Sequence, residues 1–112
     1  MDSSIVTHVF CSIQALEKLL ENSRKMLVEQ RHQPLSVHTA VLQQARALRA
    51  MRQSANNLQL EVARKDWISA VRSLQIYYGL NSLVRPEIVT TFSALSNGES
   101  CLQLQDNQAM YH

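Results

Sequence analysis

Apolar residues recur at alternating spacings of three and four through the N-terminal segment. The repeat starts at Val6, and Ser23 is its one polar position. Such spacing lines the side chains along one side of a helix, as in helices that pack in coiled-coil fashion. The segment also contains neither glycine nor proline. We therefore expect a helix from about Ser3 to Arg31, packed through Val6, Val9, Ile13, Leu16, Leu20, Ser23 and Leu27.

A second helical segment follows a break at Gln30–Leu35. Pro34 disfavours helical geometry in the residue before it, so the first helix should end there. From Leu35 to Tyr78 the chain runs for 44 residues without glycine or proline and is rich in good helix formers. The short connection predicts that the first two helices are antiparallel neighbours. The second helix is expected to pack through Val37, Val41, Ala45, Leu48, Met51, Ala55, Leu58 and Val62.

The end of the second helix allows two interpretations. Either it breaks near Arg64–Asp66, or one helix continues unbroken from Ser36 to Tyr78. We favour the break, because the side chain of Asp66 can cap a third helix. That third helix would end at Gly79, a residue type common just past helix ends. Its apolar positions are spaced four, three and four, and comprise Trp67, Val71, Leu74 and Tyr78.

A last short helix is expected after Pro86, which fits the first turn of a helix. Asn97–Gly98 would end it. The predicted fold class is therefore all-α: a long antiparallel helical hairpin with two shorter C-terminal helices, together a helical bundle. We expect residues 1–98 to form a single helical-bundle domain and the polar residues 99–112 to be a flexible C-terminal tail. The apolar face of the last helix would comprise Ile88, Val89, Phe92 and Leu95.

The composition is that of a soluble globular protein, with 46% apolar residues and a net charge of +2. The longest uncharged stretches have 14 residues, whereas a membrane-spanning helix needs roughly 20 apolar residues. No membrane span is therefore expected. No basic segment precedes an apolar run at Met1, so no secretory signal is expected either. Cys11 and Cys101 are two lone thiols, which favour a reducing compartment and a cytoplasmic location.

No motif in the chain carries a reaction. There is no glycine-rich phosphate loop and no nucleophile elbow, so we expect no enzyme activity and no cofactor. His8 and Cys11 are three residues apart and could share a metal, but zinc takes at least three protein ligands and no matching pair is present. The sequence therefore predicts no catalytic, cofactor-binding or metal-ligating residue.

Nucleic-acid binding and phosphotransfer are two alternatives to a general role in protein–protein interaction. Arg46 and Arg49 are three residues apart and share a helix face, which would suit a helical regulator that binds nucleic acid. Nucleic-acid proteins usually present a larger basic cluster. His38 could relay phosphate in a degenerate phosphotransfer-like bundle, although the glycine and basic residue typical of such domains are missing after it. Both remain alternatives.

Arg52 and Gln59 interrupt the apolar stripe of the second helix. At 100° per residue from Val41, Arg52 falls at about 20° and Gln59 at about 0°. A buried unpaired arginine is costly. Arg52 should therefore reach outward to solvent, pair with an acid such as Glu17, or face another chain.

Aromatic residues gather around the predicted third helix. Trp and Tyr are enriched at interfaces because they combine a large contact area with a polar group. Packing in the core of a small bundle would explain them equally well. Together with Arg52 and Gln59, the candidate partner-binding residues are Trp67, Tyr77, Tyr78 and Phe92.

These features favour a non-enzymatic cytosolic module for protein–protein interaction. Apolar faces of a lone hairpin must be covered, so we expect a protein partner and a homodimer. In size, helicity and richness in Gln and Leu, the chain resembles the small export chaperones and adaptors of bacterial type III and flagellar secretion. The resemblance is one of build and implies no site residue.

Overall fold

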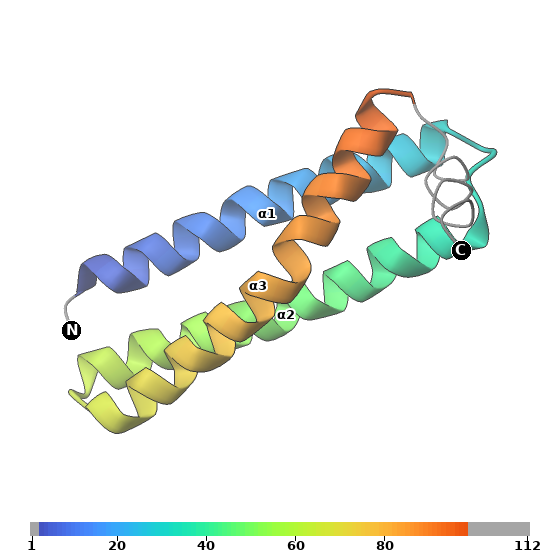
Figure 1. The fold of residues 1–112 in the computed structure, drawn as a ribbon. Helices are drawn as coiled ribbons and strands as arrows, with labels where there is room; N and C mark the ends of the chain where they lie inside the picture. The colour runs from blue at the N-terminus through green and yellow to red at the C-terminus, as the bar shows by residue number, and fades with distance from the viewer. Residues whose placement is uncertain (1–2, 99–112) are drawn as a thin grey trace.

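The computed structural model describes residues 3–98, which fold into three helices (Figure 1). The helices are α1 (Ser3–Glu29), α2 (Leu35–Ala63) and α3 (Trp67–Ser96). No strand occurs within this range. The all-α helical bundle is thus confirmed, whereas residues 99–112, expected to form a tail, lie outside the described residues.

The helices pack through seams that repeat every seven residues. The buried residues of α1 alternate in spacing between four and three from Val9 to Leu27, as the sequence predicts. In α2 the same alternation runs from Val37 to Leu58. In α3 it passes through Ala70, Leu74 and Tyr77 and resumes further along the helix. Coiled-coil-like packing of this kind buries one stripe of each helix. The largest buried side chains are Ile13, Leu16, Met51, Leu58, Tyr77, Ile88 and Leu95.

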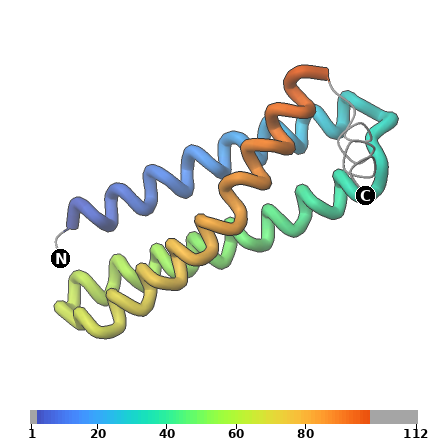
Figure 2. Tube along the Cα trace, in the orientation of Figure 1, coloured from blue at the N-terminus to red at the C-terminus, as the bar shows by residue number. Residues whose placement is uncertain are grey.

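The third helix crosses from one neighbour to the other (Figures 1 and 2). Near its start, Ser73 donates a hydrogen bond to Glu61 at the end of α2. Near its end, the Gln30 side chain donates to the Leu95 carbonyl, 2.9 Å away, beside the end of α1. All three pairs of helices are in contact, and α3 therefore closes one side of the α1–α2 pair.

The turn between α2 and α3 falls at the favoured break. The amide of Asp66 donates to the Glu61 carbonyl and that of Lys65 to the Val62 carbonyl, which is the Schellman arrangement at a helix end. Lys65 has φ 59°, a conformation more usual for glycine. The Asp66 side chain then accepts from the Ser69 amide at 3.3 Å and caps α3 as expected. The alternative of one unbroken helix from Ser36 to Tyr78 is wrong.

The prediction of two shorter C-terminal helices is also wrong. Gly79 does not end a helix, and Pro86 does not begin one, because both lie inside the 30-residue α3. Tyr77 before Gly79 and Val84 and Ile88 after it are all buried in one core. An unbroken helix keeps them on one seam, and their burial outweighs the local propensities of glycine and proline. Pro86 cannot donate the bond to Ser82, and α3 changes direction in this region (Figure 2).

Gly79→Ala is expected to stabilise the protein by about 0.5–1 kcal/mol. Glycine inside a helix costs about that much relative to alanine, and a Cβ at this position would meet nothing within 4 Å. Urea denaturation followed by circular dichroism measures the change. A glycine that ended the helix with positive φ would give the opposite result, because alanine is strained there. Destabilisation by Gly79→Ala would therefore contradict the continuous helix.

Candidate functional site

Arg52 pairs with Glu17 across the α1–α2 contact. Its guanidinium donates two hydrogen bonds to the carboxylate, Nε–Oε2 at 2.9 Å and Nη2–Oε1 at 2.6 Å. It also lies over the Phe10 ring, 5.6 Å from the ring centre. The hydrogen bonds and charge of Glu17 raise the pKa of Arg52 further, against a smaller opposing effect of burial. Of the three arrangements considered for Arg52, pairing with Glu17 is the one observed, so this arginine has an intramolecular partner.

The Arg52–Glu17 pair should contribute modestly to stability. Its side chains are 35% and 39% exposed, and water and salt screen such pairs. A double-mutant cycle with Arg52→Gln and Glu17→Gln is expected to give a coupling energy of about 0.2–1 kcal/mol. The coupling should shrink as salt is added to the urea denaturation. A coupling that is absent at low salt would contradict the bidentate geometry.

Gln59 does not lie within the buried stripe. The side chain is exposed, whereas Leu58 beside it is almost fully buried. The prediction that Gln59 lies in the stripe assumes 100° per residue, which is 3.6 residues per turn. The seam of α2 repeats every 3.5 residues instead. The error grows with distance from Val41, because a heptad seam drifts by about 20° every seven residues relative to a straight helix.

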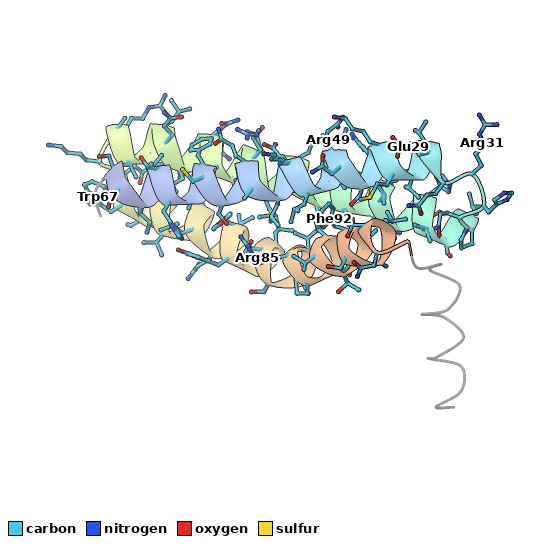
Figure 3. The ribbon with its side chains drawn as sticks, turned by 90° about the horizontal axis from the view of Figure 1, so that it is seen from above. Glu29, Arg31, Arg49, Trp67, Arg85 and Phe92 are labelled. Carbon is cyan, nitrogen blue, oxygen red and sulfur yellow. The ribbon has the colours of Figure 1, made fainter. Side chains whose placement is uncertain are left out.

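The four aromatic candidates have different environments. Tyr77 is 1% exposed and belongs to the core, and Phe92 is half-buried. Trp67 and Tyr78 are exposed, and Figure 3 places Trp67 at one end of the molecule. The rings of Tyr77 and Tyr78 meet edge to face with centroids 5.0 Å apart. Tyr77 thus supports Tyr78 from beneath, and only Trp67 and Tyr78 present substantial aromatic surface to solvent.

The packed face of α3 is offset from the predicted one. Of the positions Trp67, Val71, Leu74 and Tyr78, only Leu74 is buried. The seam instead runs through Ala70, Leu74 and Tyr77. Ala70 is small and contributes little to the apolar pattern. The pattern of larger side chains therefore predicts a neighbouring face of the helix instead.

Four partly exposed apolar side chains form a strip along α3. At 100° per residue they fall within about 40° of one another around the helix. Each is between 42% and 45% exposed. This α3 strip consists of Trp67, Val71, Tyr78 and Val89.

Exposed apolar surface is concentrated on this helix. Of the eleven large apolar side chains exposed in residues 3–98, seven belong to α3, three to α2 and one to α1. At 100° per residue, four of the seven form the α3 strip, whereas Ile68, Ile76 and Leu83 lie at least about 60° outside it, on other sides of the helix. The α3 strip has Trp67 and Tyr78 on one side of the same helix, eleven residues apart, and does not include Arg52 or Gln59.

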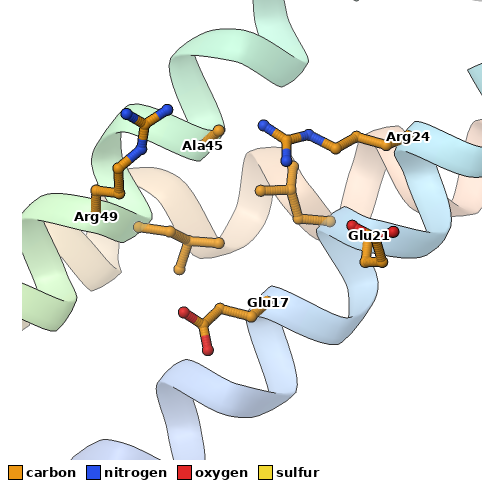
Figure 4. A pocket seen from close by; sticks show the side chains of 7 residues that line it. Glu17, Glu21, Arg24, Ala45 and Arg49 are labelled. Carbon is orange, nitrogen blue, oxygen red and sulfur yellow. The ribbon is translucent and has the colours of Figure 1, made fainter.

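A shallow pocket opens between α1 and α2 (Figure 4). Its volume is about 230 Å³. Arg24 from α1 and Arg49 from α2 line it, together with two acids, Glu17 and Glu21. Mixed charge of this kind does not favour nucleic acid, which attracts clusters of one sign. Binding through Arg46 and Arg49 therefore stays a prediction that no feature of this surface supports.

Three buried polar residues were not predicted from the sequence: Gln44, Ser54 and Ser73. Gln44 is 1% exposed and its amide nitrogen donates to Thr91 Oγ1 at 3.0 Å, which ties α2 to α3. The amide oxygen of Gln44 is buried without a partner within the described range. Its place midway between Val41 and Leu48 in the seam is the signal that could have revealed it.

Within residues 3–98 no group of three or more His, Cys, Asp or Glu side chains could hold a metal ion. Over the same residues, no helix is both long and apolar enough to cross a membrane. Comparison with known proteins gives no match to any family model, curated protein or solved structure.

Proposed function

We propose that the protein is a non-enzymatic module that binds a partner protein on the α3 strip. The observation that carries this proposal is the alignment of Trp67, Val71, Tyr78 and Val89, each a little under half exposed, along one side of a helix. Half-exposed side chains have already lost part of their conformational entropy on folding, so ordering them on binding costs less free energy. Trp and Tyr are also the residues that most often dominate binding energy at interfaces.

A cytosolic chaperone or adaptor, such as those of bacterial secretion or flagellar export, is the kind of protein proposed. What supports it is the build: a small all-helical bundle with an apolar strip that an amphipathic helix of a client could cover. Of the predicted contact residues, Trp67 and Tyr78 are the two that support the proposal, because both side chains are exposed on α3. Arg52 and Tyr77 are engaged inside the bundle, and Phe92 is half-buried.

Site-specific photo-crosslinking in the native host tests the proposal. A crosslinking residue at Val71 is expected to give a discrete adduct with another protein. The matched control is Leu83, which lies on the same helix, is 72% exposed and is outside the strip. With the crosslinking residue kept at Val71, Tyr78→Ser together with Val89→Ser should abolish capture and leave the fold intact, because both positions are exposed. The same adducts from Val71 and Leu83, or none from either, would refute the α3 strip as a docking surface.

Self-association through the same strip is expected in the absence of a client. Light scattering over a tenfold concentration range should show a mass that rises from near 12.7 kDa towards twice that value. Val71→Ser with Tyr78→Ser should hold the protein at the lower mass, whereas Leu83→Ser should not. A mass that stays near 12.7 kDa at every concentration would contradict the predicted homodimer.

A further inference from the structure

The turn between α2 and α3 forms a basic and apolar end of the molecule. Figure 1 shows this turn at the end opposite to the α1–α2 connection, and Figure 3 places Trp67 there and Arg31 at the other end. Five exposed basic or apolar residues lie here, two in the turn after the end of α2 and three in the first two turns of α3, with the exposed Asp66 between them. This group, called the tip below, consists of Arg64, Lys65, Trp67, Ile68 and Arg72.

The tip carries three positive charges, and the two acids nearest to it, Glu61 and Asp66, reduce the local sum to +1 (three minus two). The two nearby acids are both engaged: Asp66 accepts from the Ser69 amide, and both carboxylate oxygens of the half-buried Glu61 accept from Ser73. No ion pair other than Arg52–Glu17 forms within the described chain, so Arg64, Lys65 and Arg72 keep their charges for a partner. The positive end of the α3 dipole points the same way.

The apolar part of the tip projects outward. Ile68 is 73% exposed and Trp67 is 43% exposed. Helical side chains lean towards the N-terminus of their helix, and the N-terminus of α3 is the tip itself. Trp67 and Ile68 therefore lean towards the end of the molecule. The left-handed conformation of Lys65 keeps the connection between α2 and α3 short.

We propose that the tip binds the surface of an anionic lipid bilayer. Trp67 and Ile68 would enter the boundary between headgroups and acyl chains, where tryptophan is favoured, and the three cations would meet the lipid phosphates and carboxylates. Because the turn lies at one end of the molecule, a flat anionic surface can approach the tip end-on (Figure 1). The binding is peripheral. It shares Trp67 with the α3 strip but needs neither Tyr78 nor Val89, so the two proposals can fail separately.

Trp67 makes the test direct, because it is the only tryptophan in the chain. The full chain is titrated with vesicles of phosphatidylcholine alone and with vesicles that also contain phosphatidylserine. A blue shift of the tryptophan emission with the second vesicle only, reversed by added salt, is expected. No shift with anionic vesicles, or an equal shift with neutral ones, would overturn the proposal. An equal shift with soluble poly-glutamate or inorganic phosphate would also overturn it, since the ligand would then be an anion and not a membrane.

Variants assign the binding to the tip. Lys65→Glu and Arg72→Glu should each weaken partition onto anionic vesicles by at least about fivefold, the effect of losing one cation near such a surface. Ile68→Ser should reduce the blue shift. Arg46→Glu and Leu83→Ser are the matched controls, exposed positions of the same kinds outside the tip, and should bind as the parent does. Equal losses in tip and control variants would overturn the assignment. Circular dichroism checks that each variant is folded. If Lys65→Glu does not fold, Arg72→Glu alone tests the role of the cations.

Discussion

Leu16→Ala and Leu48→Ala are each expected to lower the free energy of unfolding by about 2–5 kcal/mol. Leu16 is 0% and Leu48 is 3% exposed, and both belong to the one core that the three helices share. Truncation removes buried apolar surface and leaves a cavity that a close-packed core only partly fills. Total stability for a small domain is about 5–15 kcal/mol, so either change should lower the midpoint of thermal unfolding markedly.

Leu42→Ala is the matched control for these core changes. Leu42 lies on α2 and is 45% exposed, so its truncation should cost much less. Urea denaturation followed by circular dichroism gives all the values. If Leu16 and Leu48 face each other, as the sequence predicts, the double variant should lose less than the sum of the single losses. Core variants as stable as Leu42→Ala would show that the seams are misassigned.

The first two helices could be predicted because their large apolar residues lie on the seam itself. In α1 every buried position from Val9 to Leu27 follows the expected spacing, and Ser23 occupies its place in the series with its hydroxyl bonded to the Leu19 carbonyl. The pairing of Arg52 with Glu17 could be named from the sequence only as one of three alternatives. A charge at the margin of an apolar stripe needs a partner within reach, and few acids are available.

The details that failed depend on geometry accumulated over many residues. Gln59 is 18 positions from Val41, and the difference between 3.6 and 3.5 residues per turn amounts over that length to roughly 50°. That rotation is enough to move a side chain from a seam to solvent. The error at Gln44 is the opposite one, since a polar side chain lies in the core where none is expected. Its hydrogen bond to Thr91 lowers the cost of that burial.

The third helix could not be predicted because tertiary packing overrides its local signals. Gly79 and Pro86 are strong breakers in isolation, yet the core residues on either side share a single seam. The exposed face of α3 could not be predicted for the same reason. The spacing of Trp67, Val71, Leu74 and Tyr78 predicts a packed face through Trp67 and Tyr78, whereas Ala70 and Tyr77 occupy that face. No local pattern marked Lys65 and Ile68, because only the position of the turn makes them a surface.

Removal of residues 80–112 is expected to unfold the protein, because the second half of α3 closes the bundle. Val84, Ile88 and Leu95 are each at most 3% exposed, and full burial of one such side chain stabilises by about 1.5–3 kcal/mol. The loss of all three, about 4.5–9 kcal/mol, is comparable to the whole stability of a small domain. The truncation also removes Leu95 and Thr91, the hydrogen-bond partners of Gln30 and Gln44.

A chain that ends at Gly98 is the control for this truncation and should stay folded. It retains every buried residue of the core, together with the end of α3, where the Gly98 amide donates to the Leu95 carbonyl. Circular dichroism and thermal unfolding compare it with the chain that ends at Gly79. We expect cooperative unfolding from the longer chain and little stable helix from the shorter one, whose α1 and α2 would expose Leu16, Met51 and Leu58 to water. A cooperative transition in the shorter chain would show that α1 and α2 are self-sufficient. The third helix would then be an appended arm and not the closing element of the bundle.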